Sequence, residues 1–298
     1  MPSAGPTAHA AGHSRALPAR SATETPFFFA VQGVPLYAVL HDAAAERAGA
    51  PVVVHVHGLG VEQITLYRQE VLSARAAAAL GFPVFRYHAR GHGDSAGASA
   101  DVTLDTLVAD ARAAADEAKR RTGATRVVWL GVRIGALVAA LAGGPRSGRD
   151  DPAGFVLWEP VMKPAEFFRQ QLRTMLFSQV AGGHKPDATV DELLSRLEAQ
   201  GSLDVFGYTL QRSLVQSFAD ASLAVGLDGV RVPVLLAQVQ ARTRLAPPYA
   251  QWAEALQGVT RIATATIRSE PGYQLMSNPA WPSDALTSAT AEWLDALA

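Results

Sequence analysis

The chain has 298 residues, of which 49% are hydrophobic and 18% are charged, and its formal net charge is −1. This composition predicts a large folded unit with a substantial buried core rather than a disordered chain. A net charge so close to zero attracts neither nucleic acid nor an anionic membrane, so we expect neither as a partner. The sequence contains no cysteine, which excludes disulfides, thiolate catalysis and cysteine-based metal sites and fits a cytoplasmic protein.

The N-terminal half alternates short apolar runs with segments of helical periodicity. Residues 1–25 are rich in Ala, Pro, Ser and Gly without an apolar run, so we expect a flexible tail and no secretion signal. Segments 27–31 and 36–41 flank a turn with Gly33 and predict a β-hairpin. Further strands are expected at 51–57, 83–88, 126–130 and 154–158, and helices at 66–80, 103–121 and 134–142. This alternation is typical of a parallel sheet with helices on both faces.

The alternation stops between residues 163 and 228, where the sequence is mostly helical in pattern and contains no convincing strand. A connection of this length between two sheet strands is more typical of a cap than of a loop. Strands at 232–239 and 262–267 and helices at 249–256 and 285–297 then complete the sheet. We therefore expect a core of residues 26–162 and 229–298, with a helical cap inserted at 163–228.

Residues 127–140 read VVWLGVRIGALVAA, an apolar strand that continues into Gly-x-Arg-x-Gly and a helix of small residues. This is the pattern of a nucleophile elbow, a strand–turn–helix that presents one side chain between two glycines. The position of the nucleophile holds Arg133, and a guanidinium stays protonated and cannot act as a nucleophile. The same stretch is too short, and too charged at Arg133, to span a membrane, so no membrane span is expected.

Three segments in this order together resemble the α/β-hydrolase superfamily: His55–Gly60, Tyr87–Ser95 and the Gly131–Gly135 elbow. The resemblance covers nearly the whole chain from about residue 27. It implies an α/β-hydrolase fold, with a mostly parallel sheet, helices on both faces and an inserted helical cap. It also implies an oxyanion hole that is formed by main-chain N–H groups of the His-Gly loop, at Leu59, and of the elbow, at Ile134.

Several shorter phrases resemble one bacterial branch of this superfamily, the exosortase-system-associated hydrolases. They are FFF at 27–29, Glu62, GHGDSAG at 91–97, LWEPV at 157–161, FRQQLR at 168–173 and GYTL at 207–210. In this branch the elbow serine is often replaced as well, and no substrate is established. The resemblance therefore implies an esterase-like bacterial protein without naming what it acts on.

A serine hydrolase of this fold needs a serine at the elbow, then an acid, then a histidine, in that chain order. The elbow holds Arg133, and the segment from Gln238 to Arg244, after the strand that should lead to the acid, contains no carboxylate. The final loop, Arg268–Met276, contains no histidine, and none follows His184 anywhere in the sequence. The ordinary acyl-enzyme mechanism is therefore not expected.

Two roles stay open for Arg133. It could face a ligand, since a guanidinium beside a helix N-terminus suits a carboxylate, a phosphoryl group or an acyl-carbonyl oxygen. It could instead form an internal ion pair with Glu159 or with Glu62, which would satisfy a charge that is costly to bury alone.

Two functions follow from these roles. The first is an enzyme that acts on a small acyl or carboxylate substrate by a triad-independent route, with Arg133 and the oxyanion amides polarising a carbonyl and Glu62 or Glu159 acting as base. The second is a pseudoenzyme that binds a small anion or a partner protein. A homo-oligomer is compatible with both.

The remaining candidate residues are polar groups of the two glycine-rich loops. His57, His88, His92 and Glu62 should meet at the pocket mouth, but their spacing matches no metal-ligand signature, so we expect no metal and no cofactor. His92 is expected to brace its loop. Ser95 is the best remaining hydroxyl, although it is more typical of a helix cap than of a nucleophile. The predicted catalytic residues are thus Arg133, Glu62 and Glu159, and the predicted binding residues are Leu59, Ile134, His57, His92 and Ser95.

Overall fold

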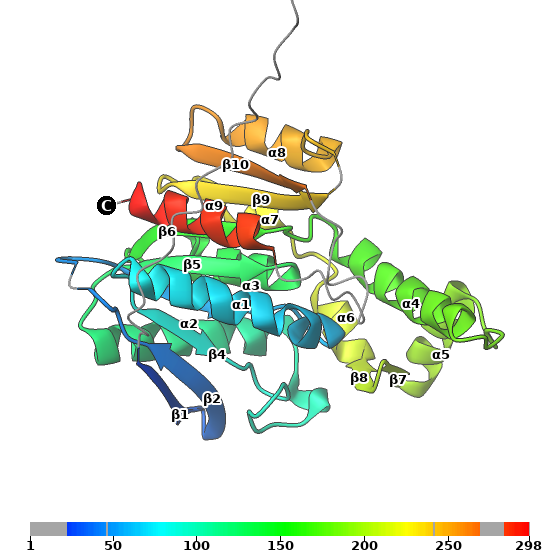
Figure 1. Cartoon of the computed structure of the whole chain (residues 1–298). Coiled ribbons are helices and arrows are strands. Elements are labelled where there is room, and N and C mark those ends of the chain that lie inside the picture. Colours follow the sequence, from blue (N-terminus) through cyan, green and yellow to red (C-terminus); the bar gives the residue numbers. More distant parts are fainter. Residues whose placement is uncertain (1–22, 46, 241, 269–282, 298) are drawn as a thin grey trace, which may run out of the picture.

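The computed structural model of the protein describes residues 23–45, 47–240, 242–268 and 283–297. Eight strands form one sheet in the order β1-β2-β4-β3-β5-β6-β9-β10 (Figure 1). The strands are β1 (Glu24–Val31), β2 (Val34–His41), β3 (Val52–Val56), β4 (Val84–Tyr87), β5 (Val127–Val132), β6 (Pro152–Trp158), β9 (Val234–Gln240) and β10 (Ile262–Arg268). Strands β1 and β2 form an antiparallel hairpin at one edge, β2 is antiparallel to β4, and the other neighbours are parallel. The mostly parallel sheet that the sequence predicts is therefore present.

Helices cover both faces of this sheet (Figure 1). Helices α1 (Val61–Ala79) and α9 (Asp284–Asp295) share one apolar cluster with the sheet, and α2 (Leu104–Thr122), α3 (Ile134–Gly143) and α8 (Pro247–Leu256) share the other. Strand β5 contributes to both clusters, with Trp129 on one face and Val128 and Leu130 on the other. A parallel strand that is buried on both faces must be apolar throughout, which is why β5 reads as a continuous apolar run.

Helix α2 shows how local sequence sets these elements. The side chain of Thr103 accepts a hydrogen bond from the main-chain N–H of Thr106 and caps the first turn. Gly123, with φ of 72°, ends the helix in the left-handed conformation that favours glycine. Between them, Leu107 and Ala111 are buried one turn apart and face the sheet.

Between β6 and β9, helices α4 and α5 and the β7–β8 hairpin extend away from the core beyond one end of the sheet (Figure 1), whereas the last helix of this segment, α7, packs against α3 in the core. The elements of this segment are α4 (Pro164–Ala181), α5 (Val190–Gln200), β7 (Ser202–Val205), β8 (Tyr208–Gln211), α6 (Arg212–Ser217) and α7 (Leu223–Gly226). Leu172, Leu193 and Val205 form a small apolar cluster of its own. Two short turns of 3₁₀ helix, Ser99–Asp101 and Pro145–Ser147, complete the described helices and strands.

Three expectations from the sequence need correction. The cap segment contains the antiparallel hairpin β7–β8, whose turn residues Phe206 and Gly207 both have positive φ, whereas the sequence predicts no strand there. Helix α1 begins at Val61 rather than at residue 66, so Glu62 lies in its first helical turn. Strand β1 begins at Glu24, within the segment expected to be a tail; the rest of that prediction, residues 1–22, lies outside the described residues.

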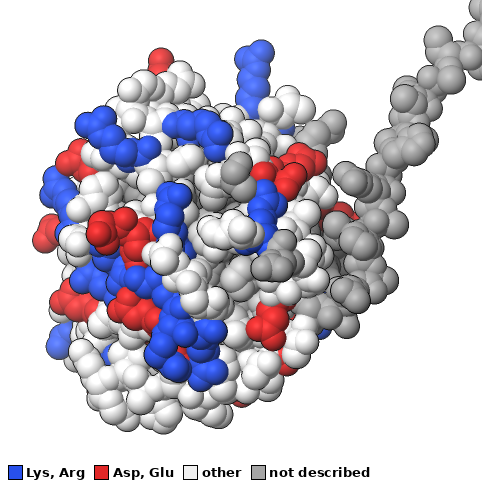
Figure 2. All heavy atoms as spheres, turned by 90° about the vertical axis from the view of Figure 1, so that its left-hand side faces the viewer, with Lys and Arg blue, Asp and Glu red and all other residues white. Residues whose placement is uncertain are grey.

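Charged side chains of both signs are interspersed on the face shown in Figure 2. The basic run at the end of α2 is paired with carboxylates: Lys119 with Asp151, and Arg120 and Arg121 with Glu117. This run is therefore a solvated helix end rather than an open cationic patch. None of the helices in the described part of the chain is both long and apolar enough to cross a membrane.

Candidate functional site

The elbow between β5 and α3 has the backbone geometry that the sequence predicts. Arg133 adopts φ of 55° and ψ of −119°, a strained conformation for a residue with a side chain. Its N–H donates to Trp158 O at 2.9 Å, and its carbonyl accepts from the N–H groups of Ala136 at 3.1 Å and Val161 at 3.3 Å. Main-chain contacts thus hold the turn, whatever side chain stands at position 133.

The second elbow glycine brings two loops into contact. A Cβ on Gly135 would lie 2.3 Å from the carbonyl oxygen of His57, and one on Gly131 would lie 2.4 Å from Cα of Ala136. Only glycine fits at such distances. The start of α3 therefore packs directly against the end of β3, beside the loop that leads into α1.

The Arg133 guanidinium forms a buried ion pair within the protein. Its Nε donates to Oε1 of Glu62 at 3.2 Å, and its Nη1 donates to the main-chain carbonyl of Glu159 at 3.2 Å. Glu159 itself has φ of 45°, which turns the chain at the end of β6. The ion pair joins Arg133 to Glu62, while the described contact with Glu159 is made by a main-chain oxygen.

The carboxyl group of Glu62 lies between the loop before α1 and the elbow. Its Oε1 also accepts a hydrogen bond from the Gln171 side chain of cap helix α4 at 3.0 Å, whereas Oε2 is sealed from solvent without a partner. A Cβ on Gly58 would lie 3.3 Å from this Oε2. Burial raises the pKa of Glu62, and the charge of Arg133 and the hydrogen bonds from Arg133 and Gln171 oppose that rise.

The two main-chain N–H groups that the sequence assigns to an oxyanion hole belong to Leu59 and Ile134. Ile134 is the first residue of α3, and Leu59 lies two residues before α1 begins. Within the described ranges, neither N–H donates a hydrogen bond to a protein acceptor. The N–H of Ile134 is one of the unpaired N–H groups of the first turn of α3, where a negatively charged or polar oxygen is favoured, and the N–H of Leu59 belongs to the loop just before the N-cap residue Gly60 of α1.

The three histidines of the glycine-rich loops come together, as the sequence predicts. The ring centroid of His57 lies 6.0 Å from that of His88 and 5.9 Å from that of His92. His57 donates from Nδ1 to Gly58 O at 2.6 Å and accepts at Nε2 from the N–H of Ala89 at 3.1 Å. Burial lowers the pKa of His57 to about 3, so its ring is neutral and both nitrogens are occupied by the two loops.

Glu62 does not join these histidines, because its carboxylate is bound to Arg133 and Gln171. Burial also lowers the pKa of His88, to about 4, and its Nδ1 accepts from the N–H of Asp94. Across the parts of the chain that the structure describes, no group of three or more His, Asp or Glu side chains is arranged to hold a metal ion.

Ser95 braces its loop instead of capping a helix, which corrects the expectation from the sequence. Its hydroxyl donates to the carbonyl of His88 at 2.6 Å and accepts from the N–H of Tyr37 at 2.8 Å. The same loop carries a second buried ion pair, in which Arg90 contacts Asp110 of α2. The sequence analysis did not single out this pair, because its partners lie 20 positions apart in different elements.

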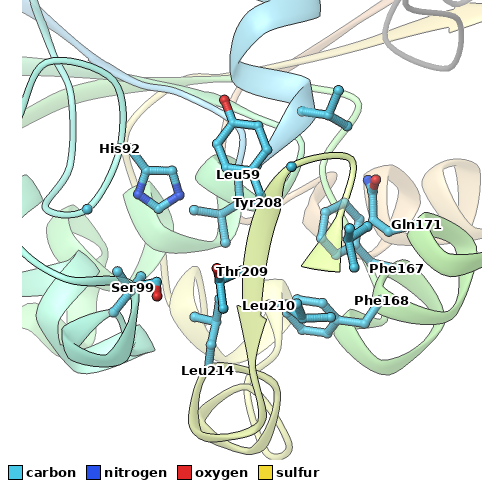
Figure 3. A pocket seen from close by; sticks show the side chains of 16 residues that line it. Leu59, His92, Ser99, Phe167, Phe168, Gln171, Tyr208, Thr209, Leu210 and Leu214 are labelled. Atoms are coloured by element: carbon cyan, nitrogen blue, oxygen red, sulfur yellow. The ribbon is translucent and has the colours of Figure 1, made fainter. Parts of the chain in front are cut away.

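A cavity of about 270 Å³ lies between the core loops and the cap (Figure 3). Of the predicted site residues, Leu59 and His92 line it, and the cap adds Phe167, Gln171 and Tyr208, which the sequence analysis missed. Most of the other lining side chains are Leu, Val and Phe. Among the described residues that line it, none is Arg133, Glu62 or Glu159, so Gln171 connects the cavity to the buried ion pair.

Comparison with known proteins identifies the family. A family model described as "Serine aminopeptidase, S33" matches residues 48–252. The chain belongs to this family. No curated protein matches the chain.

Solved structures of low identity share the fold. Est1E from Butyrivibrio proteoclasticus with bound ferulic acid is 20% identical, with a TM-score of 0.62 over 90% of this chain and 97% of that one. An esterase from Pyrococcus furiosus is 17% identical, with a TM-score of 0.59 over 92% of each chain. The mouse α/β hydrolase domain-containing protein 10 is 12% identical, with a TM-score of 0.54 over 92% of this chain and 98% of that one. The predicted α/β-hydrolase fold is thereby confirmed.

Proposed function

We propose that this α/β-hydrolase-fold protein binds a small acyl compound between its cap and its core and does not form a serine acyl-enzyme. The observation that carries the proposal is the Arg133–Glu62 ion pair at the elbow. A protonated guanidinium cannot attack a carbonyl, and here it is also buried and bound to a carboxylate. The sequence supports the same conclusion, because no histidine follows His184 to act as the base of a triad.

The ion pair also occupies the space in which an acyl group would meet a nucleophile. The carboxyl of Glu62 contacts the elbow through Arg133 and the cap through Gln171. Breaking such a pair leaves an uncompensated charge inside the protein, which strongly disfavours its displacement by a ligand. These contacts favour the pseudoenzyme among the two functions that the sequence leaves open.

The proposed ligand class rests on the cavity. A lining of mostly Leu, Val and Phe suits the apolar part of a small molecule, with a few polar groups to orient it. Est1E, a structural relative, has ferulic acid bound in its solved structure, which supports a small acyl compound.

The test is to measure binding and turnover in the same preparation. Short-chain esters and thioesters should raise the thermal midpoint of the protein, while nitrophenyl esters should give no burst of nitrophenol. A fluorophosphonate probe should not label the protein. Fluorophosphonate labelling together with a nitrophenol burst would overturn the proposal, and an Arg133→Ser variant serves as the matched control for a restored hydroxyl.

A second function, triad-independent hydrolysis, is favoured by one observation, the unpaired Oε2 of Glu62. Buried carboxyls with a raised pKa are typical of general bases. In this scheme Glu62 takes a proton from water, the water oxygen adds to the acyl carbon, and the alcohol or thiol leaves with a proton. Arg133 and the N–H groups of Leu59 and Ile134 would stabilise the carbonyl oxygen.

Slow hydrolysis that disappears in Glu62→Gln would establish this second function over the first. Hydrolysis that persists unchanged in Glu62→Gln and in Arg133→Ala would show that neither residue takes part in the mechanism. The rate should rise with pH as Glu62 loses its proton, because only the carboxylate accepts a proton from water.

The proposal places the protein in the cytoplasm of a bacterium, within the exosortase-system-associated branch. The phrases at 91–97 and 157–161 support the branch, and the lack of cysteine in the whole sequence supports the compartment. Light scattering after size exclusion would decide whether it forms a homo-oligomer.

A further inference from the structure

Among the side-chain atoms of the cavity, Nε2 of His92 has a fixed hydrogen-bonding role. Nδ1 of His92 contacts the carbonyl of Arg90 at 2.9 Å, and a carbonyl can only accept, so the ring hydrogen is on Nδ1. Burial lowers the pKa of His92, so the ring is neutral and its Nε2 carries a lone pair. This Nε2 has no partner among the described residues and is not one of the unpaired atoms sealed from solvent. It therefore opens onto the cavity that His92 lines.

A second polar group with a fixed role is the main-chain N–H of Leu59. It can only donate, and it has no acceptor in the described part of the structure. Leu59 lines the same cavity, and Figure 3 shows its side chain close to His92. The hydroxyls of Ser99, Tyr208 and Thr209 also line the cavity, but a hydroxyl donates or accepts as needed and so does not select a ligand.

The lining also constrains the charge of the ligand. Of the described residues that form it, none is Lys, Arg, Asp or Glu. Arg133 of the elbow does not line the cavity and is already paired with Glu62. A carboxylate in this cavity would lose its hydration without gaining a cation, which is strongly unfavourable.

The volume limits the size of the ligand. At about 270 Å³, the cavity is close to the lower end of the roughly 300–1,000 Å³ that is common for small-molecule sites. The apolar side chains of Phe167, Phe168, Leu210 and Leu214 lie on the side of the cavity away from His92 (Figure 3). A ligand with its polar end at His92 and an apolar chain toward these residues fits this arrangement.

We propose that the cavity binds an uncharged amide with an apolar chain, whose N–H donates to His92 Nε2 and whose carbonyl accepts from the N–H of Leu59. An amide carries both a donor and an acceptor, so it can bond to both of these groups. An ester lacks the donor, and a carboxylate lacks the donor and adds a charge. This inference rests on the proposed function, since it names the ligand class of the same cavity.

The test compares four ligands with the same number of non-hydrogen atoms by isothermal titration: octanamide, its isomer N,N-dimethylhexanamide, methyl heptanoate and octanoate. Octanamide should bind about tenfold more tightly than the dimethyl isomer or the ester, because each lacks the N–H that His92 accepts. Octanoate should bind most weakly of the four. Equal affinity of octanamide and its dimethyl isomer overturns the inference, and so does octanoate binding as well as octanamide.

Two variants assign the selectivity to His92. In His92→Phe, the tenfold preference for octanamide over methyl heptanoate should disappear. Retained ester binding shows that the cavity has folded. His184→Phe, which changes an exposed histidine outside the cavity, should retain the tenfold preference.

The failures of the two proposals are distinguishable. If none of the four compounds binds, the proposed function fails and this inference fails with it. If the ester and octanoate bind but octanamide has no advantage, the proposed function stands and only the ligand class is wrong.

Discussion

Among the described residues, Arg90–Asp110 and Arg133–Glu62 are buried arginine–carboxylate pairs, and they differ in how completely their oxygens are hydrogen-bonded. In the loop after β4, Arg90 donates from Nε and Nη2 to both oxygens of Asp110, with distances of 2.6 to 3.1 Å, and its main-chain N–H adds a bond at 3.0 Å. At the elbow, Arg133 makes one bond to Glu62, and one oxygen of Glu62 has no partner.

This difference in hydrogen bonding distinguishes a purely structural pair, Arg90–Asp110, from the pair at the candidate site, Arg133–Glu62. Every oxygen of Asp110 is bonded, so this pair has no capacity left for a ligand. The elbow pair keeps an unsatisfied oxygen, and Gln171, which bonds the other oxygen of Glu62, lines the cavity. Buried polar atoms without partners are uncommon in folded proteins, and they concentrate where function requires them.

The largest effect is expected from breaking the saturated pair. Asp110→Ala leaves Arg90 buried without a counter-charge, which should lower the free energy of unfolding by about 3–5 kcal/mol. Unfolding in urea, monitored by circular dichroism, measures this free energy. Asp116→Ala removes an exposed carboxylate of the same helix and should cost about 0–1 kcal/mol. A cost no larger than that of the control would show that the Arg90 pair contributes nothing net.

A third buried carboxyl, Glu70 of α1, extends the comparison because its Oε1 has no partner at all. Burial raises its pKa from 4.5 to about 7, against the opposing charge of Arg86. The folded protein then binds more protons than the unfolded chain between these values, so this stabilisation is present below about pH 4.5 and is lost as pH rises to about 7.

Glu70→Gln should abolish this loss of stability with rising pH. The free energy of unfolding of the variant, relative to the unmodified protein, should rise by about 3 kcal/mol from pH 4.5 to 7.5. Urea titrations at both pH values measure the difference. The comparison cancels the histidines His57 and His88, whose lowered pKa values give the opposite slope. Parallel pH profiles for the two proteins would contradict the expectation.

Removing both partners of the elbow pair should lower the free energy of unfolding by less than the sum of the two single changes. Glu62→Leu and Arg133→Met should each lower the free energy of unfolding by about 2–3 kcal/mol, because the remaining charge keeps one bond: Arg133 to the carbonyl of Glu159, or Glu62 to Gln171. The double variant should show a coupling of about 1–3 kcal/mol. A double-mutant cycle in urea measures this coupling, and additive costs would mean that the two charges do not stabilise each other.

The smallest effect is expected from the loop hydroxyl. Ser95→Ala removes its bonds to His88 and Tyr37 and should cost about 1–2 kcal/mol. Ligand affinity should not change, because Ser95 does not line the cavity. Ser178→Ala, on the exposed end of α4, is the matched control. A loss of binding in Ser95→Ala at unchanged stability would assign this serine to the site.

The sheet and its helices could be predicted from the sequence because each buried strand is an apolar run and each helix has a regular apolar face. The start of α1 could not, because its buried face includes the polar residues Glu62, Gln63, Gln69, Glu70 and Ser73, which disrupt the apolar periodicity. The hairpin β7–β8 could not be predicted either. Its strands are four residues each and mostly half-buried, which leaves little alternation of apolar and polar residues to detect.

The candidate site could be predicted in part. The spacing of Gly131, Arg133 and Gly135 gives the elbow because these positions are neighbours in the chain. The partner of Arg133 lies 71 positions away, and Gln171 lies 109 positions from Glu62, so their contacts depend on how the cap and the core meet. The prediction for the final loop, which includes 269–276, lies outside the described residues.

The elbow's main chain has a consequence for how such proteins diverge. Its left-handed turn is held by hydrogen bonds to Trp158 and Val161 and by two glycines, none of which depends on the side chain at position 133. Substitutions at that one codon can therefore remove a nucleophile, or restore one, while the loops around it keep their places. The nucleophile position can therefore change without rebuilding the elbow, although a working triad also needs an acid and a histidine.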